Sequence, residues 1–403
     1  MTLRYTALDS VHRALGATMT DFAGWDMPLR YGSEREEHNA VRTRAGLFDL
    51  SHMGEITVTG PQAGELLDHA LVGFVSALAV NKARYTMICA ADGGILDDLI
   101  VYRTGEAEFL VVANASNAQL VLDELTARAD GFDATVRDDR DAYALIAVQG
   151  PEATAILAPL TDADLPGLKY YTITPGGFEW LYPSRSGVSQ GSGASRPESL
   201  EHTSLPATVA GRPALLARTG YTGEDGFELF VAPGDAEPLW HALSEAGAAR
   251  GLVPCGLSCR DTLRLEAGMP LYGHELSTEL TPFDAGLGRV VRFDKTTNGG
   301  TFIGREALEK AAELAASHPP RVRVGLVSPG RRVPRAGMPV VAADGAVIGT
   351  ITSGAPSPTL GKPIAMAYVD AAHAAPGTAV AVDVRGTHEP VEVVALPFYK
   401  RAR

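Results

Sequence analysis

The stretch Gly93-Gly94-Ile95-Leu96-Asp97-Asp98-Leu99-Ile100-Val101-Tyr102 combines a strong strand signal with two unexpected acids. A glycine pair favours a turn, and the apolar run that follows it predicts a buried strand. A buried carboxylate costs several kcal/mol unless it is paired, so Asp97 and Asp98 need an explanation. Because successive side chains of a strand point to opposite faces, only one of the two can face a given pocket.

A second apolar run, Phe109 to Ala113, follows a turn-like segment and ends at Asn114. If the two runs pair as a hairpin, Asp98 lies opposite Ala113 or Asn114, depending on the register. An acid and an amide then meet at the same end of one ladder. These residues fit equally well an interpretation in which the two aspartates only bond the amides of the turn.

The composition predicts a folded protein with several domains. The chain has 403 residues, 45% of them hydrophobic and 21% charged, which is typical of a soluble globular protein with two or three cores. A net charge of −13 argues against non-specific binding to nucleic acid or to an anionic membrane surface. We expect a cytoplasmic location, because no signal core or membrane span is evident and three cysteines are too few for a disulfide framework. Two of them, Cys255 and Cys259, lack the spacing of a zinc site, and no metal is expected.

Short helices and strands alternate along the first 300 residues, which favours an α+β fold over a long parallel sheet. From Arg321 onward, closely spaced strands broken by Gly and Pro predict a small β barrel or sandwich. Residues 187–205 are rich in Ser, Gly and Pro, and predict an exposed, mobile insertion. The helices are expected at residues 34–44, 62–71, 117–129, 256–267 and 304–316.

Two further polar residues are candidates for a site. His52 lies beside Met53, although a lone histidine is more often a hydrogen-bonded structural residue. Glu228 lies inside a predicted strand after a glycine-rich turn, where an acid is again unexpected. Its structural alternative is a charge on an edge strand that faces water.

Arg260 and Arg264 lie one helical turn apart and project from one face of a predicted helix. Paired arginines suit a carboxylate-bearing ligand, because each guanidinium forms two parallel hydrogen bonds. The same two residues equally fit surface ion pairs with Asp261 and Glu266.

Seven motifs occur in order along the chain and together carry a family resemblance. They are Phe22-Ala-Gly-Trp25, Phe48-Asp-Leu-Ser-His-Met53, Gly93-Gly-Ile-Leu-Asp-Asp-Leu-Ile-Val101, Val148-Gln-Gly-Pro151, Thr219-Gly-Tyr-Thr-Gly-Glu-Asp-Gly-Phe-Glu228, Arg260-Asp-Thr-Leu-Arg-Leu-Glu-Ala-Gly268 and Thr352-Ser-Gly-Ala-Pro-Ser-Pro358. Over nearly the whole chain they resemble the glycine cleavage T-protein family, whose members are tetrahydrofolate-dependent aminomethyltransferases. The resemblance implies a three-domain cloverleaf around a central folate channel. Two interleaved α+β domains would occupy residues 1–285, a connecting segment residues 286–320, and a C-terminal β barrel residues 321–403.

The resemblance also implies a reaction. The family takes an aminomethyl group from the lipoyl arm of a partner, the H-protein, and N5 of tetrahydrofolate captures its carbon. Ammonia leaves, and 5,10-methylene-tetrahydrofolate forms with reduced lipoyl. The implied partners are therefore a lipoylated H-protein and a folate, without metal, nucleic acid or membrane. A fixed carboxylate stabilises the positive charge that develops on the transferred carbon.

Motif by motif, the resemblance assigns roles to single residues. Asp98 matches the catalytic carboxylate, Glu228 the acid that binds the pterin, and Arg260 the arginine that fixes the folate. The remaining folate-binding positions match Met53, Tyr85, Asn114, Tyr221 and Tyr399. The chain departs from the family pattern at residues 286–290, where many relatives carry a Trp, so one stacking surface is missing or replaced by Arg289. The insertion at 187–205 is also unusual, and we expect it on the surface away from the channel.

Two alternatives share this fold. The closest is a tetrahydrofolate-dependent demethylase of a small methylated amine or sulfonium compound, because a fold does not fix a function. Amine oxidases fused to this fold would need a dinucleotide fingerprint, which the sequence lacks. A non-enzymatic folate-binding scaffold of iron–sulfur assembly would carry a Lys-Gly-Cys motif, which is also missing.

Overall fold

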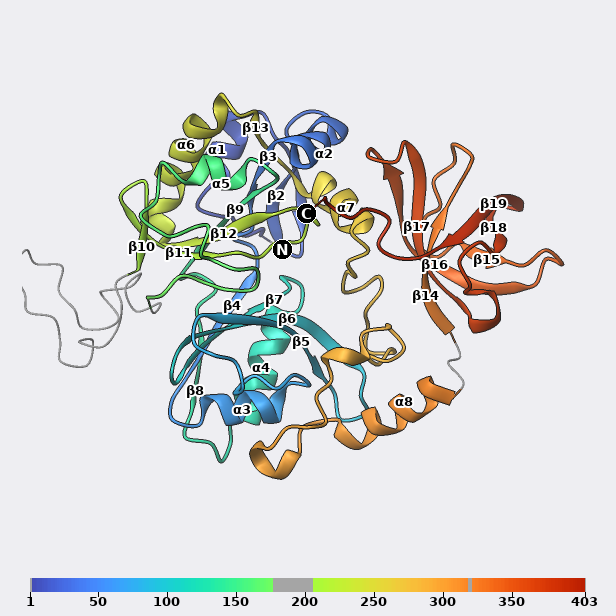
Figure 1. Ribbon diagram of the computed structural model, residues 1–403, viewed down its shortest axis with the longest axis horizontal. Helices are drawn as coiled ribbons and strands as arrows, with labels where there is room; N and C mark the ends of the chain where they lie inside the picture. The colour runs from blue at the N-terminus through green and yellow to red at the C-terminus, as the bar shows by residue number, and fades with distance from the viewer. Residues whose placement is uncertain (1, 177–205, 318–320, 403) are drawn as a thin grey trace, which may run out of the picture.

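The chain forms three lobes, which are separated in Figure 1. The structure is a computed structural model that describes residues 2–176, 206–317 and 321–402. The insertion expected at 187–205 lies outside these residues. Two lobes are built on sheets, and the third is a closed barrel. This architecture confirms the prediction of an α+β fold with a C-terminal β barrel.

The six-stranded lobe contains a mixed sheet in which only β3 and β13 run parallel. Its strands, in order across the sheet, are β10 (Ala207–Val209), β11 (Arg212–Ala217), β12 (Gly226–Val231), β9 (Ala144–Gln149), β3 (Ala45–Asp49) and β13 (Leu252–Pro254). Its helices are α1 (Asp9–Ala14), α2 (Glu34–Thr43), α5 (Ala153–Leu157), α6 (Pro233–Ala248) and α7 (Leu257–Glu266). A small hairpin, β1 (Thr18–Phe22) and β2 (Trp25–Arg30), precedes α2.

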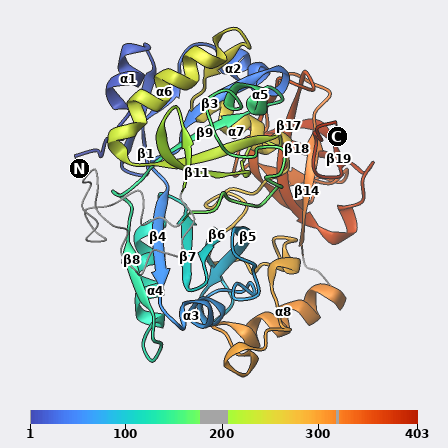
Figure 2. The same cartoon turned by 60° about the vertical axis from the view of Figure 1, so that its left-hand side comes forward.

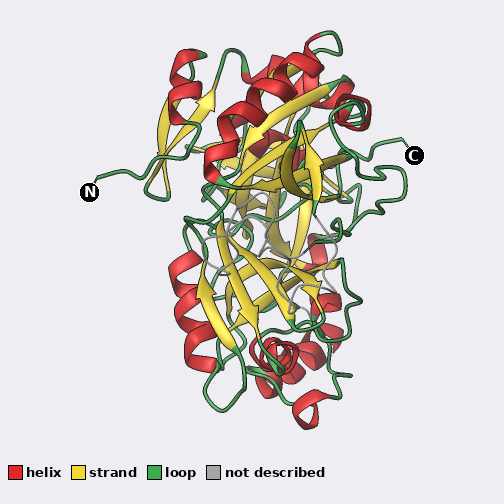
Figure 3. Cartoon of the chain, turned by 90° about the vertical axis from the view of Figure 1, so that its left-hand side faces the viewer, coloured by secondary structure: helices red, strands yellow, loops and turns green. Residues whose placement is uncertain are grey.

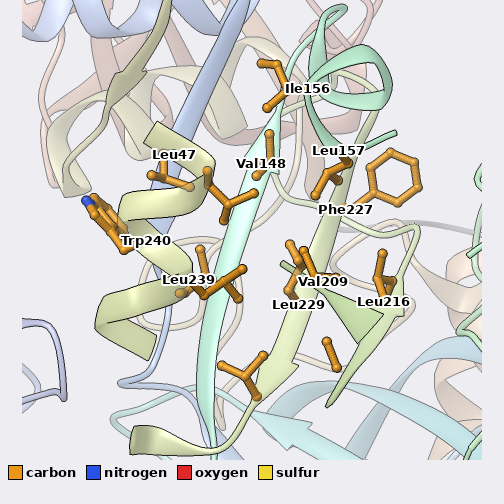
Figure 4. Packing of buried hydrophobic residues seen from close by; sticks show 14 of the residues in the cluster. Leu47, Val148, Ile156, Leu157, Val209, Leu216, Phe227, Leu229, Leu239 and Trp240 are labelled. Carbon is orange, nitrogen blue, oxygen red and sulfur yellow. The ribbon is translucent and has the colours of Figure 1, made fainter. Parts of the chain in front are cut away.

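Both faces of this sheet are buried, because alternate side chains enter two different cores. On one face, Leu239 and Trp240 of α6 pack against Leu47, Val148 and Leu229 (Figure 4). The other face contributes residues such as Phe230 to a core shared with α2, α7 and the neighbouring lobe. The sheet is therefore an inner layer of the molecule.

The five-stranded lobe is an antiparallel sheet covered by helices on its outer face. Its strands, in order, are β5 (Lys82–Cys89), β6 (Ile95–Gly105), β7 (Glu108–Ala113), β4 (Gly54–Thr59) and β8 (Thr135–Asp138), and its helices are α3 (Ala63–Ala70) and α4 (Ala118–Arg128). Tyr102, Leu110 and Val112 point the other way and join the core that contains Phe230. The two sheets thus face each other, with helices on the outside (Figure 3).

The turn before β6 forms where the glycine pair predicts it. Gly93 has a φ of 87°, which favours glycine, and a Cβ on Gly94 would overlap the carbonyl oxygen of Thr278. The backbone N–H of Ile95 then donates to the carbonyl of Leu280 at 3.0 Å. The loop near residue 280 therefore passes directly over the start of β6.

The third lobe is a closed six-stranded barrel. Its strands are β14 (Arg321–Val327), β17 (Lys362–Asp370), β16 (Val347–Ser357), β15 (Pro339–Val341), β18 (Ala379–Val384) and β19 (Thr387–Val394), with β19 returning to β14. β19 carries polar residues such as His388 and Glu392, which weaken the strand signal in its sequence. Viewed from another side, the barrel lies next to the six-stranded lobe (Figure 2).

Residues 286–317 run along the lower edge of the five-stranded lobe, and α8 extends from there toward the barrel (Figure 1). The segment contains η3 (Gly288–Val290), η4 (Thr297–Gly300) and α8 (Arg305–Ser317), and a further short helix, η5 (Ala371–His373), follows β17. Phe302 and Leu308 share a core with Met87 of β5, so this segment packs on the five-stranded lobe. The division into domains stays a prediction. None of the helices in the described ranges combines the length and apolar character needed to cross a membrane.

Candidate active site

A cavity of about 510 Å³ lies where the two sheets face each other. Strands of both sheets line it, together with α7, the loop at residues 269–274 and the tip of the β1–β2 hairpin. Its wall contains seven of the residues to which the family resemblance assigns a role, Met53, Tyr85, Asp98, Asn114, Tyr221, Glu228 and Arg260. Segments that are far apart in the chain therefore meet at one site.

Asp98 and Asn114 meet as the hairpin predicts. Ile100 pairs with Val112, and this register continues to place Asp98 opposite Asn114. The Asn114 side-chain amide donates to Asp98 Oδ1 at 2.8 Å, and the Tyr85 hydroxyl donates to Asp98 Oδ2 at 3.0 Å. Asp98 thus faces the cavity with hydrogen bonds from neutral donors.

Asp97 points to the opposite face and is fully buried. Its carboxylate accepts from the backbone N–H of Asn114 at 3.0 Å and from the amides of Asn114 and Asn117 at 2.9 and 2.7 Å. The aspartates therefore do more than bond the amides of their own turn. Asp97 holds Asn114, and Asn114 in turn holds Asp98.

Both aspartates lie in an environment that disfavours their charge. Burial raises the pKa of Asp98 to about 6, although hydrogen bonds from Tyr85 and Asn114 oppose the shift. Burial and the neighbouring charge of Asp98 raise the pKa of Asp97 to about 7. Within the described part of the chain, no cation forms an ion pair with either acid. A positively charged group in the cavity would find one carboxyl group, that of Asp98, without a cationic partner.

Glu228 lies on another wall of the cavity and is 8% exposed. The hydroxyl of Thr219 donates to its Oε2, and the Tyr102 hydroxyl lies 3.4 Å from the same oxygen. Burial raises the pKa of Glu228, while the Thr219 hydrogen bond and the charge of Arg260 lower it. The interpretation of Glu228 as an edge-strand charge is wrong, because β12 lies inside the sheet between β11 and β9.

Arg260 extends from α7 into the cavity, and its guanidinium lies 4.8 Å from the ring centre of Tyr221. The Tyr221 hydroxyl donates to the carbonyl of Pro270, so this residue offers its ring to the cavity. Of the two interpretations left open for Arg260 and Arg264, joint binding of a ligand is wrong, and the ion pair with Asp261 is found for Arg264 at 2.7 Å. Arg264 is 1% exposed, outside the cavity lining, and bonded to Glu275 at 2.8 Å.

Two expected residues lie elsewhere. The backbone N–H of Tyr399 donates to the carbonyl of Glu266 at 2.8 Å, and its ring lies 4.1 Å beneath the guanidinium of Arg42. Tyr399 therefore contacts the end of α7 and does not line the cavity. Arg289 is exposed in η3, also outside the lining.

Several wall residues were missed or misjudged in the sequence. Tyr102 and Tyr171 line the cavity, and Tyr171 has a φ of 59°, which is unusual for a bulky residue. Its conformation is held by backbone hydrogen bonds to Arg218 and Ala83, contacts that no local pattern predicts. His52 also lines the cavity, and its Nδ1 is buried without a hydrogen bond among the described residues. The hydrogen bond that a structural histidine would make is therefore not found at Nδ1 of His52 in this part of the chain.

Glu37, Cys255 and Cys259 form a compact buried group whose possible ligand atoms lie within 4.8 Å of one another. The carboxylate of Glu37 already accepts the backbone N–H groups of Tyr31, Gly32 and Gly256 at 2.7 to 3.1 Å. Burial raises the pKa of the Cys259 thiol, which disfavours the thiolate that a metal binds. This group holds the loop before α7 in place.

Comparisons with known proteins show the family of the chain. A family model described as the GCVT N-terminal domain matches residues 8–181 and 197–295, and the glycine cleavage T-protein C-terminal barrel domain matches residues 321–400. An aminomethyltransferase of Streptomyces avermitilis is 71% identical over 99% of this chain and 98% of its own length. One from Saccharopolyspora erythraea is 58% identical over the same shares of both chains. The crystal structure of the glycine cleavage system aminomethyltransferase T from Bartonella henselae covers 99% of both chains, with a TM-score of 0.83 and 35% identity. The chain belongs to the glycine cleavage T-protein family of aminomethyltransferases.

Proposed function

We propose that this chain is the aminomethyltransferase of a glycine cleavage system and that its cavity brings tetrahydrofolate to an aminomethyl group on the lipoyl arm of an H-protein. The observation that carries the proposal is Asp98, an acid in the cavity that is bonded only to neutral donors. The volume of about 510 Å³ suits a folate, because small-molecule sites span roughly 300 to 1,000 Å³.

In the proposed reaction, one carbon changes its partners. The protonated aminomethyl group loses ammonia, its carbon–sulfur bond breaks, and the carbon forms bonds to N5 and N10 of tetrahydrofolate. N5 and N10 each release a proton, of which ammonia takes one and the lipoyl thiolate takes the other. Positive charge develops on the carbon as the bonds break, and the Asp98 carboxylate stabilises that charge.

The other residues bind and orient the folate. We assign Glu228 to the amino-pyrimidine edge of the pterin, because a carboxylate accepts two parallel hydrogen bonds. Arg260 fixes the folate by its charge and by bidentate hydrogen bonds. Met53, Tyr85, Asn114 and Tyr221 complete the folate-binding wall. Tyr399 lies outside that wall, and we assign it an indirect role, which is to hold Arg42 against the end of α7.

The proposed partners are the lipoylated H-protein and a small-molecule folate, with no metal, nucleic acid or membrane among them. A cytoplasmic location is part of the proposal. It is supported by Cys89, Cys255 and Cys259, which are free thiols.

The proposal is tested by the release of ammonia from aminomethyl-loaded H-protein, with and without tetrahydrofolate, by the wild type and by Asp98→Asn. Release that depends on folate and is lost in the variant is the expected result. A wild type that binds folate but releases no ammonia would favour the alternative, a tetrahydrofolate-dependent demethylase.

A further inference from the structure

His52 lies on the short link that joins β3 of one sheet to β4 of the other. Its side chain belongs to the cavity wall, and the residue is 3% exposed. The ring of Phe22 meets the imidazole edge-on, with 5.4 Å between ring centres and an angle of 90°. The ring is thus held in one place from two sides, by its own link and by the tip of the β1–β2 hairpin.

The hydrogen bonding of His52 differs from that of two other buried histidines. His12 bonds Asp49 through Nε2 at 2.9 Å and the Tyr31 hydroxyl through Nδ1 at 2.7 Å. His38 likewise has both of its ring nitrogens bonded. By contrast, Nδ1 of His52 is buried and has no hydrogen-bond partner among the described residues.

Leaving a buried polar atom without a hydrogen bond destabilises the folded protein. A buried polar atom without a partner costs about 1–3 kcal/mol, and such atoms are rare in folded proteins. An apolar side chain at position 52 would avoid this cost. In the orientation described, Nδ1 is shielded from solvent, so the penalty is removed if the imidazole turns toward the cavity and Nδ1 bonds a molecule that enters it.

The surroundings of His52 keep the ring neutral. Burial and the positive charge of Arg260 lower its pKa to about 4, while the charge of Asp49 acts in the opposite direction. A neutral imidazole has one N–H group and one lone pair, so one nitrogen is free to accept a hydrogen bond. The ring does not carry a charge that would repel a cationic ligand.

His52 also lies close to the open side of the cavity. Four lining residues are exposed, namely Phe22, Ala23, Ser116 and His274, and the first of these contacts His52 directly. Asp98 belongs to the same lining and is bonded to Tyr85. A ligand that fills the cavity therefore contacts both the wall that contains His52 and the wall that contains Asp98.

We propose that His52 contacts the substrate, and that its Nδ1 accepts a hydrogen bond from an N–H group of the molecule bound in the cavity. This inference rests on the proposed function, in which every reacting nitrogen carries hydrogen. The donor is the amino group of the aminomethyl arm or an N–H group of tetrahydrofolate. Each of these groups can donate an N–H hydrogen bond to the neutral imidazole.

The test compares His52→Leu, which removes both ring nitrogens, with His52→Asn, whose amide places a polar atom near the position of Nδ1. His69→Leu is the matched control, because His69 lies on α3 outside the cavity lining. Two quantities are measured for each protein: the equilibrium affinity for tetrahydrofolate, and kcat and KM for aminomethyl-loaded H-protein. Thermal unfolding accompanies both.

We expect His52→Leu to unfold at the wild-type temperature or above it, since it breaks no hydrogen bond within the protein. His12→Leu, which breaks two, should unfold earlier. In His52→Leu we expect either the affinity for tetrahydrofolate to fall or the KM for H-protein to rise by about tenfold, the equivalent of one hydrogen bond. His52→Asn should recover part of this change. Weaker folate binding would identify the folate as the donor, whereas a higher KM for H-protein with unchanged folate affinity would identify the aminomethyl arm.

Unchanged folate affinity and unchanged kinetics in His52→Leu would overturn the inference. A loss of activity that follows a loss of folded protein would overturn it as well, since it would assign His52 a structural role. If the wild type released no ammonia, the proposed function would fail, and folate affinity alone would then decide the role of His52.

Discussion

Acidic residues in two regions of this molecule differ in the charge of their hydrogen-bond partners. In the cavity, Asp98 accepts hydrogen bonds from Tyr85 and Asn114, and all of these donors are neutral. At the far end of α7, Glu266 is bonded by Arg42 at 3.0 Å and by His38 at 3.1 Å. Glu266 is fully removed from water and Asp98 only in part, and only Glu266 is matched by a cation, Arg42.

The two environments shift acidity in opposite directions. Burial raises the pKa of Asp98 to about 6. Burial alone would also raise the pKa of Glu266, but hydrogen bonds and charge from His38, together with the hydroxyls of Ser357 and Thr359, hold it at about 2. The comparison teaches that a cationic partner lowers the pKa of a fully buried acid, whereas an acid that lines a cavity without such a partner keeps a raised pKa and is available to a ligand.

The largest expected effect is on stability, at Glu266. Glu266→Ala leaves Arg42 buried beside Glu224 alone, and breaking such a pair costs about 3–5 kcal/mol of unfolding free energy. Urea unfolding measures this loss, with the exposed Glu245 on α6 as a matched Glu→Ala control. A loss below about 1 kcal/mol, the value of a surface pair, would contradict the contrast between the two regions.

The stabilising contribution of Glu266 has a predictable pH dependence. Its folded-state pKa of about 2 lies below the ordinary value of 4.5, so the folded protein holds fewer protons than the unfolded chain between these limits. The contribution is complete above pH 4.5 and is lost as the pH falls toward 2. The same unfolding measurements at several pH values check this sign.

Next in size is the effect of Asp98→Asn on turnover. Removing the charge that stabilises the transferred carbon should lower kcat by roughly 10² or more. Folate affinity should stay close to that of the wild type. Stability should be equal or higher, because a buried carboxylate without a cation is replaced by a neutral amide. A large fall in melting temperature would show that Asp98, like Glu266, stabilises the fold.

Substitutions on the folate-binding wall should change affinity. Glu228→Ala and Arg260→Ala each remove a charged hydrogen-bonding group and should weaken tetrahydrofolate binding by roughly tenfold or more. Isothermal titration of the two variants and of Asp98→Asn separates binding from chemistry. Equal folate affinity in all three proteins would end this division of roles.

The smallest expected effect is the response of activity to mild acid. Because the pKa of Asp98 is raised to about 6, its carboxylate is lost as the pH falls through 6, and kcat/KM should decline there. The contribution of Asp98 to the free energy of unfolding should instead increase as the pH falls through 6, since protonation removes a charge from a poorly solvated site. A rate profile that is flat down to pH 5 would contradict the assignment, provided that the protein is still folded.

Much of the fold could be predicted from local patterns. The helix expected at 62–71 is α3 at 63–70, and that expected at 34–44 is α2 at 34–43. The acid–amide pair in the β6–β7 hairpin also follows from local sequence, because a short loop limits the possible registers. Likewise, the joint occurrence of seven motifs identified the family.

The partners of individual side chains could not be predicted in this way. Arg260 and Arg264 share one face of α7, yet one enters the cavity and the other bonds Glu275. Glu228 has the local pattern of an edge strand, but β9 and β11 lie on either side of it. The helical and strand periods determine which side of an element a residue occupies, and those periods are written in the sequence. What each side meets depends on segments distant in the chain, because burial and charge act through space, and only the tertiary structure decided these contacts.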